Sequence, residues 1–361
     1  AWTRMAAWLI AAVLLSPLAI VPASWGPTIA QTKNFAFLLL GGGVVIGLIR
    51  NLWVRAFAAW ACLRYLLDGG PAWSLSAVAG ILVWGLFHEQ ARRLTESGWA
   101  RVRLGILVAA LFQVGWVLLQ LLQLDPIFRP VVPQSGPAAA FVPPVGWLGN
   151  PMDLALLLGL SLPVLTAVRP AWLGLSSAAL TALVILLVLR TTGGALAVGL
   201  TLLWLVWGWW PSWALRISVL VAVLLVGAIY LRMWDPHVDA RTLVWRQAAQ
   251  MIGQRPVLGW GGNALDHRVF FLTPRTELRW NFLFNEWLQA WLEFGVLAPA
   301  LALGYAEALA RRLRHRDAVA GECLPAAAFV LLTSGFSIPF HIGPVALLAA
   351  LMLGTLDRRL V

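Results

Sequence analysis

The chain has few charged residues and almost no lysine. Charged residues make up 11% of its 361 residues, whereas soluble domains carry about 25%. Lys33 is the only lysine, so nearly every basic side chain is an arginine. Cys62 and Cys323 are the only cysteines and lie in or beside separate apolar runs, which excludes a disulfide framework and a cysteine metal site. No repeat of about 20–50 residues occurs, which excludes the repeat architectures.

Hydrophobic residues dominate instead, at 61% with a mean hydropathy of +0.82. Apolar runs recur along the whole length and predict a polytopic, all-α integral membrane protein with about twelve transmembrane helices. We interpret residues 1–361 as one membrane domain, with the first apolar run retained as a helix. Part of the net charge of +11 reflects membrane orientation, so it does not argue for nucleic acid. The expected helix cores are 5–23, 34–49, 51–67, 71–88, 104–124, 151–168, 171–189, 193–209, 213–230, 286–306, 324–338 and 340–356.

Arginine placement predicts the orientation, because positive charge collects in cytoplasmic loops. With about twelve spans, the basic groups at 92–103, 311–316 and 358–359 all fall on one side. We take that side as cytoplasmic, which places both termini inside.

Two long segments then fall on the outer side. Residues 125–150 are rich in proline and too broken for a regular helix, so we expect a cap on the membrane interface. Residues 231–283 are rich in arginine and contain a predicted helix at 240–252, with Trp245, Ala248, Ala249 and Ile252 on its apolar face. A cationic surface on the outer side is unusual, and an anionic, lipid-linked substrate is the simplest reason for it.

Arg190 ends an apolar span at this outer face and is followed by Thr-Thr-Gly193-Gly194. An arginine at such a position can bind phosphate bidentately, and glycines allow close approach of a ligand or of backbone. The same arginine could instead extend to the phosphates of membrane lipids.

Several motifs resemble those of a known family, and they follow one another in order. An Arg-Trp helix around Trp245 precedes the turn Pro256-Val-Leu-Gly259-Trp-Gly261. The segment Asn285-Glu286-Trp-Leu-Gln289 and then Glu293-Phe-Gly295 opens the next span. Gly149-Asn150-Pro151 and Arg190 with its glycines match as well. Together, these motifs resemble the O-antigen ligase and O-antigen polymerase superfamily over residues 145–300.

The resemblance implies a GT-C-like, metal-independent and inverting glycosyltransferase without a cofactor. Such an enzyme moves a glycan from an undecaprenyl-diphosphate carrier to an acceptor at the periplasmic face of the bacterial inner membrane. The acceptor is lipid A-core for an O-antigen ligase of lipopolysaccharide biosynthesis, a growing glycan for a polymerase, or a protein for an O-oligosaccharyltransferase. We take the ligase as the first interpretation. Membrane lipids are its other expected partners.

The family usually has a histidine immediately before the Asn285 position, as its candidate general base, but this chain has Phe284 there. Another group must then accept the proton of the acceptor hydroxyl. Glu286, His267 and His341 compete for that role.

Fixed guanidinium groups would stabilise the growing charge of the leaving diphosphate. Arg190 is the first candidate for this catalytic and binding role. The other expected substrate-binding residues are Arg268, Arg275, Arg279, Arg241, Arg246 and Asn285, although Arg241 and Arg246 could instead brace the loop helix.

Two alternatives lie outside this reading. A transporter or flippase of a lipid-linked saccharide usually places charges at the bilayer midplane and often has internal repeats. Relatives of the SEDS peptidoglycan polymerases also handle lipid diphosphates, but the Asn285 to Gln289 pattern favours the O-antigen branch.

Overall fold

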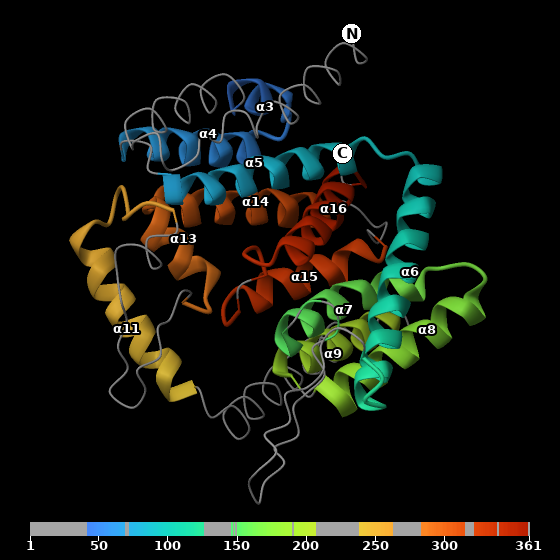
Figure 1. The fold of residues 1–361 in the computed structure, drawn as a ribbon. Coiled ribbons are helices and arrows are strands. Elements are labelled where there is room, and N and C mark those ends of the chain that lie inside the picture. Colours follow the sequence, from blue (N-terminus) through green and yellow to red (C-terminus); the bar gives the residue numbers. More distant parts are fainter. Residues whose placement is uncertain are drawn as a thin grey trace, which may run out of the picture. The chain divides into compact units, whose positions relative to one another are not determined.

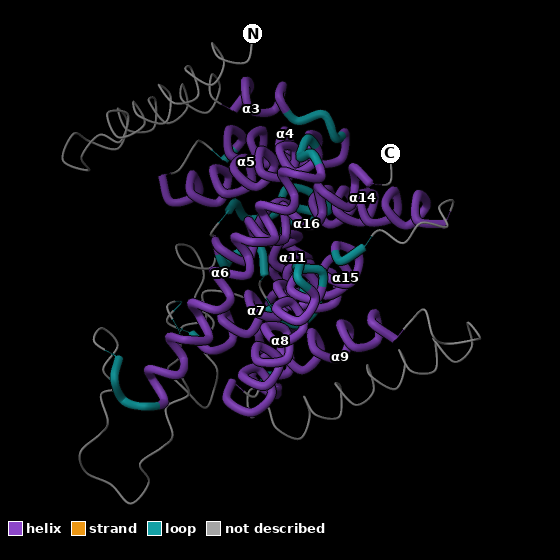
Figure 2. The backbone as a smooth tube through the Cα atoms, turned by 90° about the vertical axis from the view of Figure 1, so that its right-hand side faces the viewer, coloured by secondary structure: helices purple, strands orange, loops and turns teal. Residues whose placement is uncertain are grey.

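Every regular element that the computed structural model describes is a helix (Figures 1 and 2). The structure describes residues 42–68, 72–125, 146, 148, 150–189, 191–206, 238–262, 283–314, 321–337 and 339–359. The chain divides into two compact units, residues 1–89 with 242–314 and residues 90–241 with 315–361. The first unit is therefore built from two stretches that are far apart in the sequence.

The first unit is a group of helices around α4 (Leu52–Leu67). Short α3 (Gly43–Leu48), α13 (Glu286–Phe294) and α14 (Leu297–Arg314) all pack against α4. Most of α5 (Ala72–Arg92) and most of α11 (Val238–Gln254) also belong to this unit. Its larger apolar cluster includes Ala58, Tyr65 and Phe294, which join residues more than 200 positions apart.

The second unit is centred on α7 (Pro151–Thr166), whose side chains are buried over most of its length. Helices α6 (Glu96–Leu121), α8 (Ala171–Leu183), α9 (Thr192–Val206), α15 (Cys323–Thr333) and α16 (Gly343–Arg359) pack around it. A π-helical stretch, η3 (Val184–Leu189), continues α8. The buried α7 explains why this sequence segment is apolar on every side.

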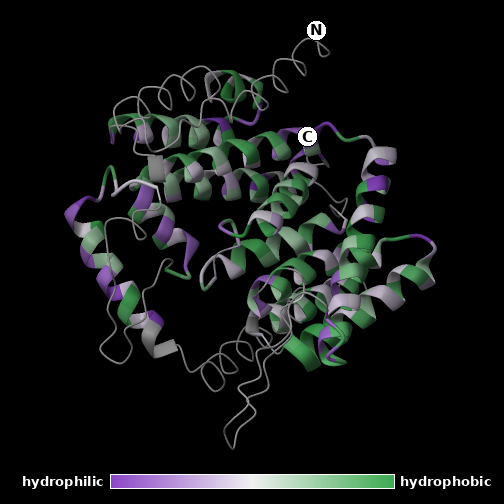
Figure 3. Ribbon diagram, viewed as in Figure 1, coloured by the Kyte–Doolittle hydropathy of each residue, from purple (hydrophilic) through white to green (hydrophobic). Residues whose placement is uncertain are grey.

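Apolar residues cover most helices, whereas α11 carries hydrophilic residues along its length (Figure 3). Two helical stretches, Glu96–Leu121 and Ala171–Leu189, are long and apolar enough to cross a membrane. The expected spans at 5–23 and 213–230 lie outside the described residues. The number of about twelve spans therefore stays a prediction, while the all-helical class is confirmed for the described part of the chain.

The prediction of one helix over 286–306 is wrong, because α13 and α14 are separated at Gly295. This residue has a φ of +75°, and a Cβ there would overlap the Val257 carbonyl oxygen. Hydropathy cannot detect such a break, since both helices are apolar. The helix predicted at 240–252 is confirmed as α11, although its buried stripe is Val244, Ala248 and Ile252, and Ala249 is exposed.

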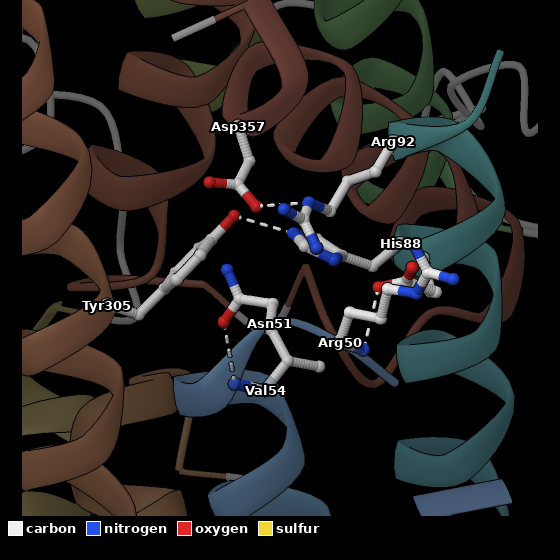
Figure 4. Close-up of polar contacts among 8 residues, drawn as sticks. Arg50, Asn51, Val54, His88, Arg92, Tyr305 and Asp357 are labelled. Atoms are coloured by element: carbon white, nitrogen blue, oxygen red, sulfur yellow. Dashed lines mark hydrogen bonds and ion pairs between the residues drawn. The ribbon is translucent and has the colours of Figure 1, made fainter. Parts of the chain in front are cut away.

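A buried polar group in each unit fixes the ends of helices, and Figure 4 draws several of these contacts. In the first unit, His88 on α5 lies 2.7 Å from the Tyr305 hydroxyl of α14. Glu89 accepts a 2.9 Å hydrogen bond from the Arg50 backbone N–H. In the second unit, Arg92 forms a 2.6 Å ion pair with the buried Asp357.

Glu322 makes a comparable junction within the second unit. It accepts hydrogen bonds from the Trp99 indole at 2.5 Å and the Arg103 guanidinium at 2.8 Å. Burial raises the pKa of Glu322, but the Trp99 indole, a backbone hydrogen bond and the positively charged Arg103 together lower it by more, so the pKa lies below its ordinary value. The start of α6 is thereby tied to the start of α15.

Candidate functional site

The glycine-rich turn after α11 interlocks with the end of α13. Trp260 N–H donates to the Leu292 carbonyl at 2.7 Å, and Gly261 N–H donates to the Glu293 carbonyl at 2.9 Å. Gly259 has a φ of +69°, and a Cβ there would lie 2.6 Å from the Gly295 nitrogen. The Pro-x-x-Gly-x-Gly and Glu-x-Gly motifs are thus two sides of one backbone junction, which explains why both need glycine.

Helix α4 braces this junction from outside the motif region. Arg64 is buried, at 4% exposure, and its Nε donates to the Leu258 carbonyl. Its second guanidinium nitrogen donates to the Gly259 carbonyl at 3.1 Å and lies 3.5 Å from the Asp68 carboxylate. Trp60 donates to the Phe294 carbonyl at 2.6 Å, which satisfies the end of α13.

The segment before α13 is held by side chains on both sides. Leu283 N–H donates to Gln289 Oε1 at 2.9 Å, and the Leu283 carbonyl accepts from the Trp245 indole at 2.6 Å. Gln289 Nε2 in turn donates to buried Glu293 at 2.6 Å. Asn285 Oδ1 accepts from Leu288 N–H at 3.0 Å and therefore caps α13.

Two candidates for the site follow directly from this arrangement. Glu286 is the first residue of α13 and is buried, at 7% exposure. Phe284, at the position of the expected histidine, has a φ of +51°, which is rare for a bulky residue. The Asn-x-x-x-Gln pattern therefore shapes the backbone on which Phe284 and Glu286 stand.

Helix α11 presents Arg246 to solvent on the side opposite its buried stripe. The buried stripe packs with Leu283, which precedes α13, and with Leu292 near the end of α13. Arg241 is partly exposed on the first turns of the same helix. Of the two, Arg246 has the exposure that a substrate contact needs.

The region around Arg190 is described only on its two flanks. The π-helical η3 ends at Leu189, and Thr191 accepts from Gly194 N–H at 3.1 Å at the start of α9. A Cβ on Gly194 would overlap Ile185, so this glycine permits close helix packing. The sequence also allowed a second role for the glycines after Arg190, the close approach of a ligand, which differs from this packing role.

The structure brings Asn285 and Glu286 together in the first unit, with Arg246 on the neighbouring helix. His341 is partly exposed in the turn before α16, in the second unit. Arg190, His267, Arg268, Arg275 and Arg279 lie outside the described residues, so their roles stay predictions. In the described ranges, no group of three His, Cys, Asp or Glu side chains lies close enough to hold a metal ion.

The second unit contains a cavity of about 400 Å³ between α6, α7 and α16. Ser161 is the one polar side chain in its lining, and its hydroxyl donates to the Leu157 carbonyl at 2.9 Å. Such a lining accommodates an alkyl chain better than a diphosphate. The apolar lining residues include Val102, Ile106, Leu347 and Leu351.

Sequence reasoning missed the role of Arg64. Arg64 lies within an apolar span, and nothing in the sequence pairs it with the Leu258 and Gly259 carbonyls, which follow 194 and 195 positions later. An arginine within an apolar span is costly unless it is paired, and this was the available signal. The buried Gln289–Glu293 pair was also missed as a support of the Leu283 backbone.

The described residues are helical, and they include two apolar stretches of membrane-spanning length. The arginine-bearing α11 beside the glycine junction adds a polar region, which is consistent with a helical membrane protein that has a polar site. Residues 154–303 match the family model described as O-antigen ligase. This match confirms the resemblance and supports membership of the O-antigen ligase and polymerase superfamily. The similarity of this segment indicates a ligase-type or glycosyltransferase-type activity. No curated protein matches the chain.

Proposed function

We propose that the chain transfers a glycan from an undecaprenyl-diphosphate carrier to an acceptor at the outer face of the inner membrane, as an O-antigen ligase does. The observation that carries this proposal is the O-antigen ligase match over 154–303. That range contains the arginine-rich segment, α11, the glycine junction and the start of α13.

The chemistry needs cations for the diphosphate and one base for the acceptor hydroxyl. Arg190, Arg268, Arg275 and Arg279 would stabilise the negative charge that develops on the leaving diphosphate, without a metal ion. Arg246 adds a cation from the exposed side of α11.

Glu286 is our first candidate for the general base. It begins a helix whose preceding backbone is fixed by Gln289 and by the Trp245 indole, so its main chain is held in place before substrate arrives. A fixed base is effective because no reorganisation is needed at the moment of reaction. His267 and His341 are the other candidates.

The central experiment uses purified protein in detergent with an undecaprenyl-diphosphate oligosaccharide, EDTA and a panel of acceptors. Release of undecaprenyl diphosphate is measured for wild type, Arg190→Ala and Arg311→Ala. Arg311 is a matched control, because its side chain is 69% exposed at the end of α14. We expect release by wild type and the control, and a loss of about 100-fold or more in Arg190→Ala.

The acceptor that gains mass identifies the subclass. Lipid A-core as acceptor supports the ligase, whereas a glycan or a protein as acceptor would replace it with a polymerase or an O-oligosaccharyltransferase. Tight, Arg190-dependent binding of the lipid without release in any reaction would overturn the transferase and support a transporter.

A further inference from the structure

The cavity between α6, α7 and α16 is a groove on the surface of the second unit. Its volume of about 400 Å³ lies within the range of ligand pockets, about 300–1,000 Å³. Gly105 and Ala109 form part of its lining on α6, and both are exposed, so the groove opens to the exterior. A Cβ added to Gly105 would meet no atom of the described residues within 4 Å, which shows that this side of the groove is open space.

The surroundings of the groove suit a membrane. Helix α6 is long and apolar enough to cross one, and its Leu104 and Val108 side chains, next to the groove, are exposed. Exposed apolar surface of this kind marks contact with a membrane or a partner. The hydroxyl of Ser161, the one polar side chain in the lining, donates to the Leu157 carbonyl, so the groove offers a ligand mainly hydrocarbon contacts.

The groove points toward an end of the second unit that carries several arginines. Arg92 precedes α6 and forms a 2.6 Å ion pair with Asp357, near the end of α16. This ion pair places the start of α6 and the end of α16 at the same end of the unit. The groove begins at Val102, about two turns into α6, and reaches Leu351, about two turns before Arg358 on α16.

Two of these arginines lie in line with the groove. Arg101 is exposed and precedes Gly105 by four residues, so both lie on the same face of α6. Arg358 follows Leu351 by seven residues, which again gives one helix face. The Nη1 nitrogen of Arg358 is buried and has no hydrogen-bond partner among the described residues. A buried cationic donor without an acceptor is costly, so a bound anion would stabilise it.

Two neighbouring arginines already have carboxylate partners. Arg92 and Arg103 each pair with a buried carboxylate, at 2.6 Å and 2.7 Å. Within the described part of the chain, neither Arg101 nor Arg358 forms such a pair. They therefore leave positive charge at this end of the groove, on the side that the arginine placement predicts to be cytoplasmic.

We propose that the groove holds one acyl chain of an anionic glycerophospholipid, whose headgroup phosphate binds Arg101 and Arg358. Basic pockets between transmembrane helices on the cytoplasmic side recognise anionic lipid headgroups, and the planar guanidinium fits phosphate oxygens. The apolar groove supplies the chain contacts and the arginines supply the selection for negative charge. This lipid site adds to the proposed glycan transfer and does not depend on it, because transfer is proposed for the outer face.

The headgroup contact is tested with the purified full chain in detergent, by native mass spectrometry. Phosphatidylglycerol and phosphatidylcholine with identical acyl chains are the probes, so that only the headgroup differs. We expect wild type to bind one phosphatidylglycerol about tenfold more tightly than phosphatidylcholine. Arg101→Gln and Arg358→Gln should each weaken phosphatidylglycerol binding about fivefold, whereas the exposed control Arg311→Gln should not.

The chain contact is tested by filling the groove. Gly105→Leu should weaken the binding of both lipids about tenfold, because its side chain takes the place of the acyl chain. Gly115→Leu is the matched control, because Gly115 is also exposed on α6 with open space around it but lies outside the groove. Ala109→Leu fills the groove from the next turn and serves if Gly105→Leu does not fold.

Three results would overturn the proposal. Wild-type affinity in both groove-filling variants would place the acyl chain elsewhere. Equal binding of the two phospholipids by wild type would remove the role of the arginines. Displacement of phosphatidylglycerol by an equimolar amount of undecaprenyl phosphate would assign the groove to the carrier lipid instead. None of these readouts requires that the protein transfers a glycan, so failure of the lipid site and failure of the proposed function are distinguishable.

Discussion

Replacing Arg64 by methionine should destabilise the junction on which the candidate site rests. Methionine keeps a long, flexible side chain but removes the guanidinium that binds the Leu258 and Gly259 carbonyls. A hydrogen bond from a charged donor contributes about 1.5–3 kcal/mol, so the loss of two such bonds costs about 3–6 kcal/mol. Relaxation of the turn and access of water would reduce this figure, and we expect about 3–5 kcal/mol, as for other broken buried ion pairs.

The free energy of unfolding in mixed micelles measures this cost, with Arg311→Met as the exposed control. Arg64→Lys should fall between wild type and Arg64→Met, because an ammonium group cannot reach both carbonyls in the geometry of a planar guanidinium. Transfer activity should also fall, because the loss of Arg64 disturbs the Gly259 turn beside the candidate site. An Arg64→Met protein as stable as the Arg311→Met control would refute the bracing role.

Three further outcomes are expected. Gly295→Ala should lower the melting temperature strongly, because the added Cβ would overlap the Val257 carbonyl. Gly253→Ala is the control and should not lower it, because open space surrounds Gly253. Equal melting temperatures of the two variants would contradict the close backbone approach at Gly295. Glu286→Gln should lower kcat by about 100-fold or more if this carboxylate is the base, and retained kcat would transfer the role to a histidine. Glu322 has a lowered folded-state pKa, so it contributes stability above its unfolded value of about 4.3, and this contribution is lost as the pH falls through the folded pKa. The unfolding free energy of Glu322→Gln should therefore depend less on pH in this acid range than that of wild type.

The all-helical class of the described residues was predictable from the long apolar runs, and α11 was predictable from its periodic apolar residues. The buried stripe of α11 differs from the predicted face at Ala249, which is exposed, and at Val244, which is buried. The apolar periodicity predicts that the segment is helical, but the residues that pack against α11 determine which of its side chains are buried.

The break at Gly295 was not predictable from hydropathy. It depends on a backbone approach by Val257, which comes from a separate segment, and composition contains no signal for such a contact. The structure shows the Asn285 side chain as a helix cap, a role that the motif alone does not specify, and its expected part in substrate binding stays a prediction.

The motifs of the candidate site could be recognised in the sequence, but the contacts between their side chains and the backbone could not. The order of the Gly259 and Asn285 motifs indicated a resemblance to the family, and the match over 154–303 supports that resemblance. How Gln289 and Glu293 support the Leu283 backbone depends on side-chain contacts that a motif does not specify.

The Arg64 contact also has a consequence for biosynthesis. The Leu258 and Gly259 carbonyls that bind Arg64 follow 194 and 195 positions later in the chain. They have therefore not yet been synthesised when α4 leaves the ribosome. At a synthesis rate of about 5–20 residues per second, the wait lasts about 10–40 s. During that interval Asp68, one helical turn away, is the nearby anion that can accompany the arginine into the membrane. Asp68 would then act during insertion as a temporary counter-ion, which the completed turn later supplements.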